Sequence, residues 1–90
     1  MEVVTSTERI IKTLSYTEMQ ILQSLAERLT EGSAKVVMGE VTENRSKAVE
    51  LLNKLSAAGV LESRSLGMKG TFIKVINREA FDAIVREVSA

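Results

Sequence analysis

The spacing of hydrophobic and polar residues changes along this 90-residue chain. Between residues 15 and 58, apolar side chains recur at the spacing of one face of an α-helix. Residues 61–76 instead hold two short runs rich in β-branched and aromatic side chains, which is typical of strands. Helical spacing returns over residues 78–88. The pattern predicts helix, helix, tight turn, helix, two-stranded hairpin and helix, in that order.

The first strong signal for a helix start is the sequence SYTE at residues 15–18. Its spacing predicts a capping box, in which the Ser15 side chain accepts from the Glu18 amide and the Glu18 side chain reaches back to the Ser15 amide. The predicted helix runs to about Thr30. Residues 1–14 hold a short helical pattern of their own, and we expect them to be the end of a linker helix.

A second and a third helix are predicted in the middle of the chain. Ser33 is expected to cap a short helix that ends at about Glu40, and VTEN at residues 41–44 to form a tight turn. Asn44 suits the N-cap of the next helix, at about residues 45–58, because its side-chain oxygen can accept from exposed amides of the first turn. The side chains expected to face the core are Val36, Val37, Ala48, Leu51, Leu52 and Leu55.

The end of the third helix also has a clear signal. Gly59 suits a left-handed residue, and Val60 follows at the hydrophobic position of a Schellman motif. Helices followed by a hairpin are the arrangement of a winged helix-turn-helix, a mainly α fold with a small β-hairpin (α+β). We expect this domain over residues 15–90, with the helix-turn-helix at about 33–58 and the wing at about 60–76, its strands at 61–65 and 71–76.

The amino-acid composition limits both the type of core and the kinds of catalytic and metal site that the chain can form. Hydrophobic residues make up 44% of the chain and aromatic residues 3%, so the core must be aliphatic. The chain has no histidine and no cysteine, and therefore lacks the commonest general base, the commonest metal ligands and the thiolate nucleophile. We expect no enzyme activity. No apolar run is long enough for a membrane span, and we expect a cytoplasmic protein with no membrane partner.

The formal net charge is zero, but the charges are unevenly distributed. Residues 42–74 hold six basic residues and three glutamates, a balance of +3, whereas the flanking segments are both negative. The basic segment contains the third helix, whose outer face would meet the major groove of DNA, and the wing. The candidate DNA contacts are Asn44, Arg45, Ser46, Lys47 and Asn53 on this helix, Arg64, Ser65 and Lys69 on the wing, and more weakly Ser33 and Lys35 at the start of the second helix.

These candidates have a simpler interpretation as an ordinary solvated face, which would look similar. Glu50 and Lys54 have the spacing of an ion pair within one helix and are weak candidates.

The sequence SRSLGMKGT at residues 63–71 has three possible roles: a phosphate-binding loop, a plain hairpin turn or a wing that contacts DNA. A phosphate-binding P-loop is excluded by the order of its residues, since no glycine stands at the required spacing before Lys69 and a strand follows. A plain hairpin turn explains Gly67 and Gly70 but not the polar side chains beside them. A wing that contacts DNA explains both, because the glycines let the backbone turn and approach closely.

The residues of the wing resemble a known family. AAGVLESRSLGMKGTFIKVIN, at residues 57–77, is very similar to the wing region of CodY, the GTP-sensing and branched-chain-amino-acid-responsive repressor of bacteria. LSYTEMQ at residues 14–20 and NRSKAVELLNKL at residues 44–55 resemble the start and the recognition helix of its DNA-binding domain, and Arg45 and Ser46 match an Arg-Ser pair there. The resemblance covers about residues 13–77. It departs from the family pattern at Glu43, where the family has an apolar residue.

The resemblance implies sequence-specific binding of double-stranded DNA, with an AT-rich palindromic operator, by a regulator of nutrient-responsive genes that is a homodimer in its full-length form. In the family the sensor is a separate N-terminal domain, so we expect an excised DNA-binding domain, with a short stand-alone relative as the alternative. In either case we expect no cofactor in this chain, with GTP and branched-chain amino acids acting on a full-length family member. The alternative function is that of a winged-helix module for protein–protein interaction or dimerisation without DNA binding, which zero net charge favours slightly.

Overall fold

A computed structural model describes the backbone of residues 2–89 and the side chains of residues 8–89. It contains α1 (Glu2–Thr13), α2 (Tyr16–Arg28), β1 (Ser33–Val36), α3 (Met38–Val41), α4 (Arg45–Ala57), β2 (Leu61–Ser65), a 3₁₀ turn (Gly67–Lys69), β3 (Thr71–Val75) and α5 (Arg78–Ser89). The three strands form one antiparallel sheet in the order β1-β3-β2. The chain is thus mostly helical with a small sheet, and the predicted α+β winged helix is confirmed.

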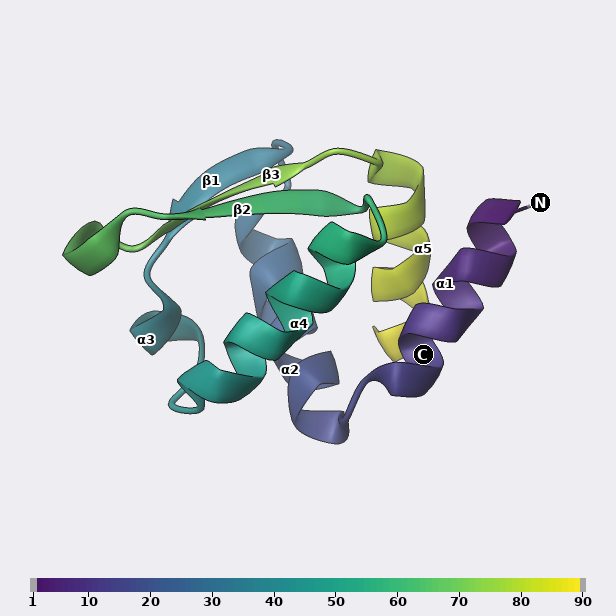
Figure 1. Cartoon of the computed structure of the whole chain (residues 1–90), viewed down its shortest axis with the longest axis horizontal. Coiled ribbons are helices and arrows are strands. Elements are labelled where there is room, and N and C mark those ends of the chain that lie inside the picture. Colours follow the sequence, from purple (N-terminus) through teal and green to yellow (C-terminus); the bar gives the residue numbers. More distant parts are fainter. Residues whose placement is uncertain (1, 90) are drawn as a thin grey trace.

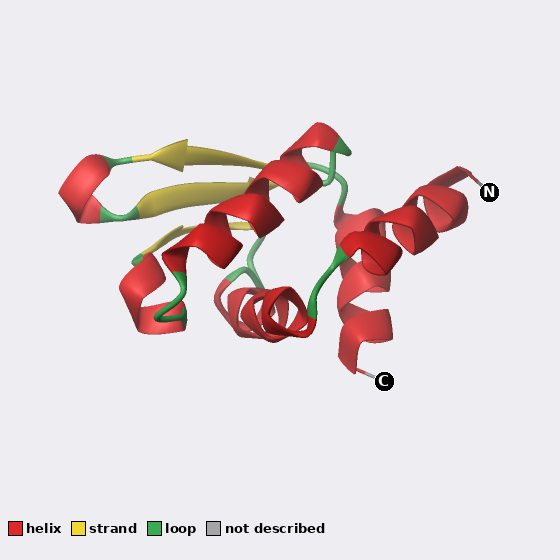
Figure 2. Ribbon diagram, turned by 60° about the horizontal axis from the view of Figure 1, so that its bottom comes forward, coloured by secondary structure: helices red, strands yellow, loops and turns green. Residues whose placement is uncertain are grey.

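The sheet and the helices form two layers. Figure 1 shows the strands along the top, with α2 and α4 beneath them and α1 and α5 at the right-hand end. The turn between β2 and β3 projects at the opposite end, beside α3 (Figures 1 and 2). The molecule is elongated, with extents of 39 × 23 × 20 Å, and carries the tip of its wing, α3 and the start of α4 at one end (Figure 1).

Local sequence signals set the helix ends. Ser15 caps α2 through the predicted box: its Oγ accepts from the Glu18 amide at 3.2 Å, and Oε1 of Glu18 accepts from the Ser15 amide at 2.9 Å. At the end of α4, the amide of Gly59 donates to the carbonyl of Ser56 and the amide of Val60 to that of Leu55, both at 3.0 Å. This pattern is the predicted Schellman motif.

The core is aliphatic, as composition requires, with Phe81 as its aromatic member. Leu22 and Leu25 of α2 are fully buried, as is Leu29, the C-cap of that helix. Helix α2 packs against α4 and α5, α4 packs against β2, and the buried side chains of all these elements form one core cluster. All four side chains that were expected to face the core from α4 are buried: Ala48, Leu51, Leu52 and Leu55.

The second predicted helix is wrong over its first half. Residues 33–36 form β1, which pairs with β3, and the helix α3 begins only at Met38. Val36 is buried, as predicted, but Val37 is exposed because it lies between the strand and the helix. Valine favours strands, and the partner strand β3 supplies hydrogen bonds that a local helical pattern cannot reveal. The predicted two-stranded hairpin is therefore part of a three-stranded sheet.

Candidate nucleic-acid interface

The start of α4 is held by its cap. Oδ1 of Asn44 accepts from the Lys47 amide at 3.1 Å, so the predicted N-cap is confirmed. The Asn44 amide in turn donates to Oγ1 of Thr42 at 3.0 Å, within the turn that follows α3. These bonds fix the first turn of α4 at the surface, next to α3, in the arrangement of a helix-turn-helix.

Helical periodicity divides the side chains of α4 between the core and solvent. Ser46, Glu50 and Asn53 lie opposite the buried stripe and are exposed. Arg45 is exposed as well and lies on the side of α4 that faces the wing. Three of the predicted contacts, Arg45, Ser46 and Asn53, thus share the accessible surface of one helix.

The two lysines of α4 have different surroundings. Nζ of Lys47 lies 3.2 Å from Oε2 of Glu50, in an exposed ion pair. Lys54 does not pair with Glu50, as its spacing suggested, but with Glu18 of α2. An exposed pair contributes little, roughly 0–1 kcal/mol, so Lys47 can exchange its partner for another anion. The partly exposed Lys54 is engaged with Glu18, and we expect no DNA contact from it.

The Glu18–Lys54 pair joins three segments of the chain. Glu18 is 1% exposed, and both of its oxygens lie 3.0 Å from Nζ of Lys54, although only Oε1 meets the geometry of a hydrogen bond. The same ammonium donates to the carbonyl of Thr13, at the end of α1, at 2.7 Å. Burial opposes ionisation of Glu18, but the Ser15 amide and Lys54 outweigh it and lower the pKa of this carboxyl. The pair therefore fixes α4 against α1 and α2.

Two glycines shape the wing. Gly67 and Gly70 have φ values of 67° and 108°, and the Leu66 amide donates across the loop to the carbonyl of Gly70 at 2.8 Å. A Cβ on Gly70 would stand 2.8 Å from the carbonyl oxygen of Val36, so this glycine also lets the wing pack closely against the end of β1. The prediction that the glycines let the backbone turn is confirmed. The predicted close approach of the wing to DNA stays a prediction.

The candidate contacts of the wing lie on different surfaces. Successive residues of a strand point to opposite faces, so Arg64 lies on the outer face of β2 and Ser65 on the inner face, opposite Thr71. Oγ of Ser65 accepts from the Gly67 amide at 3.3 Å and so supports the loop. Lys69 is exposed in the 3₁₀ turn. The structure brings Lys69 to the tip but does not gather all three side chains there.

Ser33 and Lys35 are not at the start of a helix, as predicted, but on β1, where they pair with Lys74 and Phe72 of β3. The physical reason is the strand pairing that replaces the first half of the expected helix. Lys35, Phe72 and Arg64 form one cross-strand row on the outer face of the sheet, and Phe72 is 39% exposed there.

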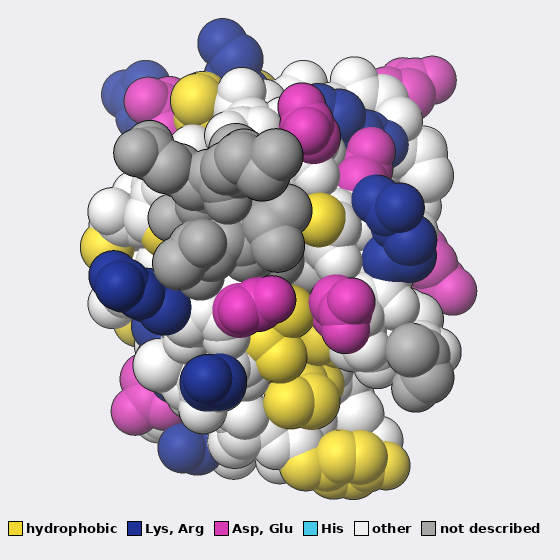
Figure 3. All heavy atoms as spheres, turned by 90° about the vertical axis from the view of Figure 1, so that its right-hand side faces the viewer, with side chains coloured by type: hydrophobic (Ala, Val, Ile, Leu, Met, Phe, Trp, Pro, Cys, Tyr) yellow, Lys and Arg dark blue, Asp and Glu magenta, His cyan; other side chains and the backbone are white. Residues whose placement is uncertain are grey.

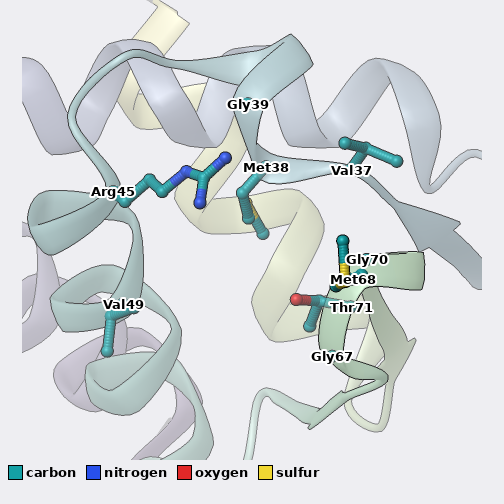
Figure 4. Close-up of a pocket in the computed structure, with 9 residues that line it drawn as sticks. All are labelled: Val37, Met38, Gly39, Arg45, Val49, Gly67, Met68, Gly70 and Thr71. Carbon is teal, nitrogen blue, oxygen red and sulfur yellow. The ribbon is translucent and has the colours of Figure 1, made fainter.

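A groove of about 390 Å³ separates α4 from the wing. Figure 4 shows the guanidinium of Arg45 reaching from α4 towards Met38 and Gly39, with Met68 on the opposite side. A Cβ on Gly39 would stand 3.4 Å from Nη2 of Arg45, at van der Waals distance, so the guanidinium lies directly beside this glycine. The groove is lined by Val37, Met38, Gly39, Arg45, Val49, Gly67, Met68, Gly70 and Thr71.

Sequence reasoning missed the apolar members of this groove. Val37, Val49 and Met68 are all exposed, and Met68 fully so. A signal was present for Val49, because it lies off the buried stripe of α4. None was present for Val37, whose exposure depends on the unexpected strand.

One comparison with known proteins decides the family. The model of the CodY helix-turn-helix domain matches residues 25–87. The chain belongs to this family. The match begins within α2 and spans α3, α4 and the wing, and it ends within α5. The CodY domain is a DNA-binding domain of regulators and not an enzyme family, and the match does not favour the alternative of a module that only binds protein.

Several cations of α4, the sheet and the wing form no ion pair, and the same holds for Arg28 of α2 and Arg86 of α5 among the described side chains. Among the side chains of residues 8–89, no ion pair is formed by Lys35, Arg45, Arg64, Lys69 or Lys74. Figure 3 shows the other end of the molecule, over α1 and α5, where acidic and basic side chains are interspersed in the coloured part of the surface. Within the described residues, no helix is both long and apolar enough to cross a membrane.

Proposed function

We propose that this CodY domain binds double-stranded DNA in a sequence-specific manner, with the first half of α4 in the major groove and the wing on the neighbouring backbone. The observation that carries the proposal is the position of Arg45. It is exposed on the first turn of α4, has no ion pair among the described side chains, and lines the groove beside the wing. Arginine is the side chain that most often reads guanine in the major groove.

The neighbouring side chains suit complementary contacts. Ser46 and Asn53, on the same surface of α4, can hydrogen-bond to base edges or phosphate oxygens. Lys69 at the tip and Arg64 on the outer face of the wing suit phosphates of the neighbouring backbone. Lys47 can leave Glu50 for a phosphate, because both side chains are half exposed and their ion pair is weak.

The finer function follows from the family. We propose that the domain acts within a bacterial repressor of nutrient-responsive genes and recognises AT-rich palindromic operators. One domain of this size covers a half-site, so a palindrome requires two copies, held together as a homodimer in the full-length protein. The isolated chain should bind more weakly than such a dimer, because its second copy is not held at high effective concentration.

The test is a binding titration of the 90-residue chain by fluorescence anisotropy, with a duplex selected from a random library. We expect Arg45→Glu to weaken binding at least ten-fold, since one bidentate contact to a base is worth about 1–3 kcal/mol and the reversed charge repels phosphate. Lys69→Ala should weaken binding to all sequences alike and reduce the slope of log affinity against log salt by about one.

Arg86→Glu is the matched control. It makes the same charge change on an exposed arginine of α5, at the other end of the molecule. The proposal fails if the wild-type chain binds no duplex at low salt. It fails equally if Arg45→Glu and Arg86→Glu weaken binding by the same factor.

A further inference from the structure

Val49 is an exposed valine in the middle of the recognition helix. It is 54% exposed and is the only large apolar side chain among the exposed residues of α4. Neither packing nor helix formation explains it, because an exposed side chain gains little from burial and valine is a weaker helix former than alanine or lysine. Its chemistry fits an apolar partner that covers α4 when the domain is bound.

The surroundings of Val49 indicate where that partner lies. Val49 stands one helical turn after Arg45, and both side chains line the groove between α4 and the wing. Val37 and Met68 extend the apolar lining to the other walls. The groove is continuous with the surface that carries Arg45, so an occupant of one contacts the other.

The major groove of DNA offers one apolar group on its base edges, the C5-methyl group of thymine. All other groups that the bases present there are hydrogen-bond donors or acceptors, for which Arg45 and Asn53 are suited and a valine is not. We infer that Val49 recognises a thymine by contact with its C5-methyl group, next to the base or phosphate that Arg45 binds. This inference rests on the proposed insertion of α4 into the major groove.

Met68 has a different role in this arrangement. Met68 belongs to the wing and lies across the groove from α4, so a DNA strand bound in the groove would pass between Met68 and α4. Because the proposed function places the wing on the DNA backbone, Met68 would meet the apolar faces of deoxyribose and not a base methyl group. Among the apolar side chains that line the groove between α4 and the wing, Val49 is therefore the one that distinguishes thymine from other bases.

The test removes the methyl group from either partner. Deoxyuridine has the pairing and the hydrogen-bonding edge of thymidine and lacks only the methyl group. Each thymine of a duplex selected by the wild-type chain is replaced singly by deoxyuridine. At one position we expect the replacement to weaken wild-type binding about four-fold, the effect of one buried methyl-sized group. Val49→Ala should bind both duplexes of that position within two-fold of each other.

Ile76→Ala is the matched control, since Ile76 is similarly exposed but lies at the end of β3 away from the groove. It should keep the four-fold preference for thymine. Val49→Ala should fold normally, because the site is exposed and alanine is the better helix former. A thermal melt that compares the Tm of this variant with that of the wild-type chain checks that it is folded.

Two outcomes overturn the inference. In the first, Val49→Ala leaves affinity unchanged or lowers it by one factor for the thymine and deoxyuridine duplexes at every position. In the second, Val49→Ala alters the oligomeric state in sedimentation without changing the thymine preference, which would make the groove a contact between copies. Failure of the proposed function is distinct from both, because the wild-type chain would then bind no duplex.

Discussion

Replacement of Lys54 by methionine should destabilise the fold more than replacement of an exposed lysine such as Lys74. The ammonium of Lys54 lies 3.0 Å from each oxygen of Glu18 and 2.7 Å from the carbonyl of Thr13. Methionine retains a flexible apolar chain and removes the charge. The Glu18 carboxylate would then stay buried with the Ser15 amide as its remaining strong donor.

The size of the loss follows from the burial of the pair. Breaking a buried ion pair costs about 3–5 kcal/mol, and the Lys54 side chain is partly exposed, so we expect about 3 kcal/mol for Lys54→Met. In Glu18→Gln the side-chain oxygen can still accept from the Ser15 amide, and the Lys54 ammonium can be solvated by water. We therefore expect this variant to lose about 1 kcal/mol of stability. The double variant should lose about 2 kcal/mol, which is less than the sum because the two charges are removed together.

Urea denaturation at pH 7 measures these changes, with Lys74→Met as the matched control. Lys74 is exposed and forms no ion pair among the described side chains, so its substitution should change stability by less than about 0.5 kcal/mol. In thermal melts, Lys54→Met should lower Tm by roughly 12 °C or more.

The pair also predicts an acid dependence. Because the folded-state pKa of Glu18 is lowered, its contribution is fully present above the unfolded glutamate pKa of about 4.3 and is lost as pH falls through the folded-state value. The free energy of unfolding of the wild-type chain should therefore fall more steeply below pH 4.3 than that of Glu18→Gln, because glutamine has no carboxyl group to protonate.

The account of the Glu18–Lys54 pair is refuted if Lys54→Met matches Lys74→Met in stability, or if the double variant shows the full sum of the single losses.

Two further predictions concern the wing and the cap. Gly70→Ala should lose more stability than Gly67→Ala in urea denaturation: both positions have positive φ, at a cost of about 1–2 kcal/mol, but only at Gly70 does a Cβ meet the backbone of Val36. Equal losses would contradict the close approach of the wing to β1. Asn44→Ala should cost about 1 kcal/mol by removing the cap of α4, whereas Asn44→Asp keeps the acceptor and the stability. An equal loss in Asn44→Asp would show that the side-chain oxygen does not cap the helix.

The helix ends and the wing strands could be predicted because the interactions that set them are local. The Ser15–Glu18 box, the Asn44 cap and the Gly59 turn each involve residues within one or two turns of each other. The candidate site was predictable to the same extent, because exposure of Arg45, Ser46 and Asn53 follows from the buried stripe of one helix. Their contact with DNA remains a prediction.

Errors arose where distant segments meet. The local pattern predicts a helix that starts at Ser33, whereas Ser33 pairs with Lys74 of β3, about forty residues further on. The spacing of Lys54 predicts an ion pair with Glu50 on its own helix, whereas its carboxylate partner, Glu18, is 36 residues away. Neither contact leaves a local pattern in the sequence.

The sequence by itself determined an aliphatic, helix-rich winged domain whose basic residues lie on the third helix of the motif and the wing. Only the tertiary structure decided which lysine is neutralised, that β1 completes the sheet, and that Val49 and Met68 face a common groove. The physical reason is range. Caps, turns and periodicity act over a few residues, whereas sheet pairing, buried ion pairs and grooves depend on contacts between residues far apart in the sequence.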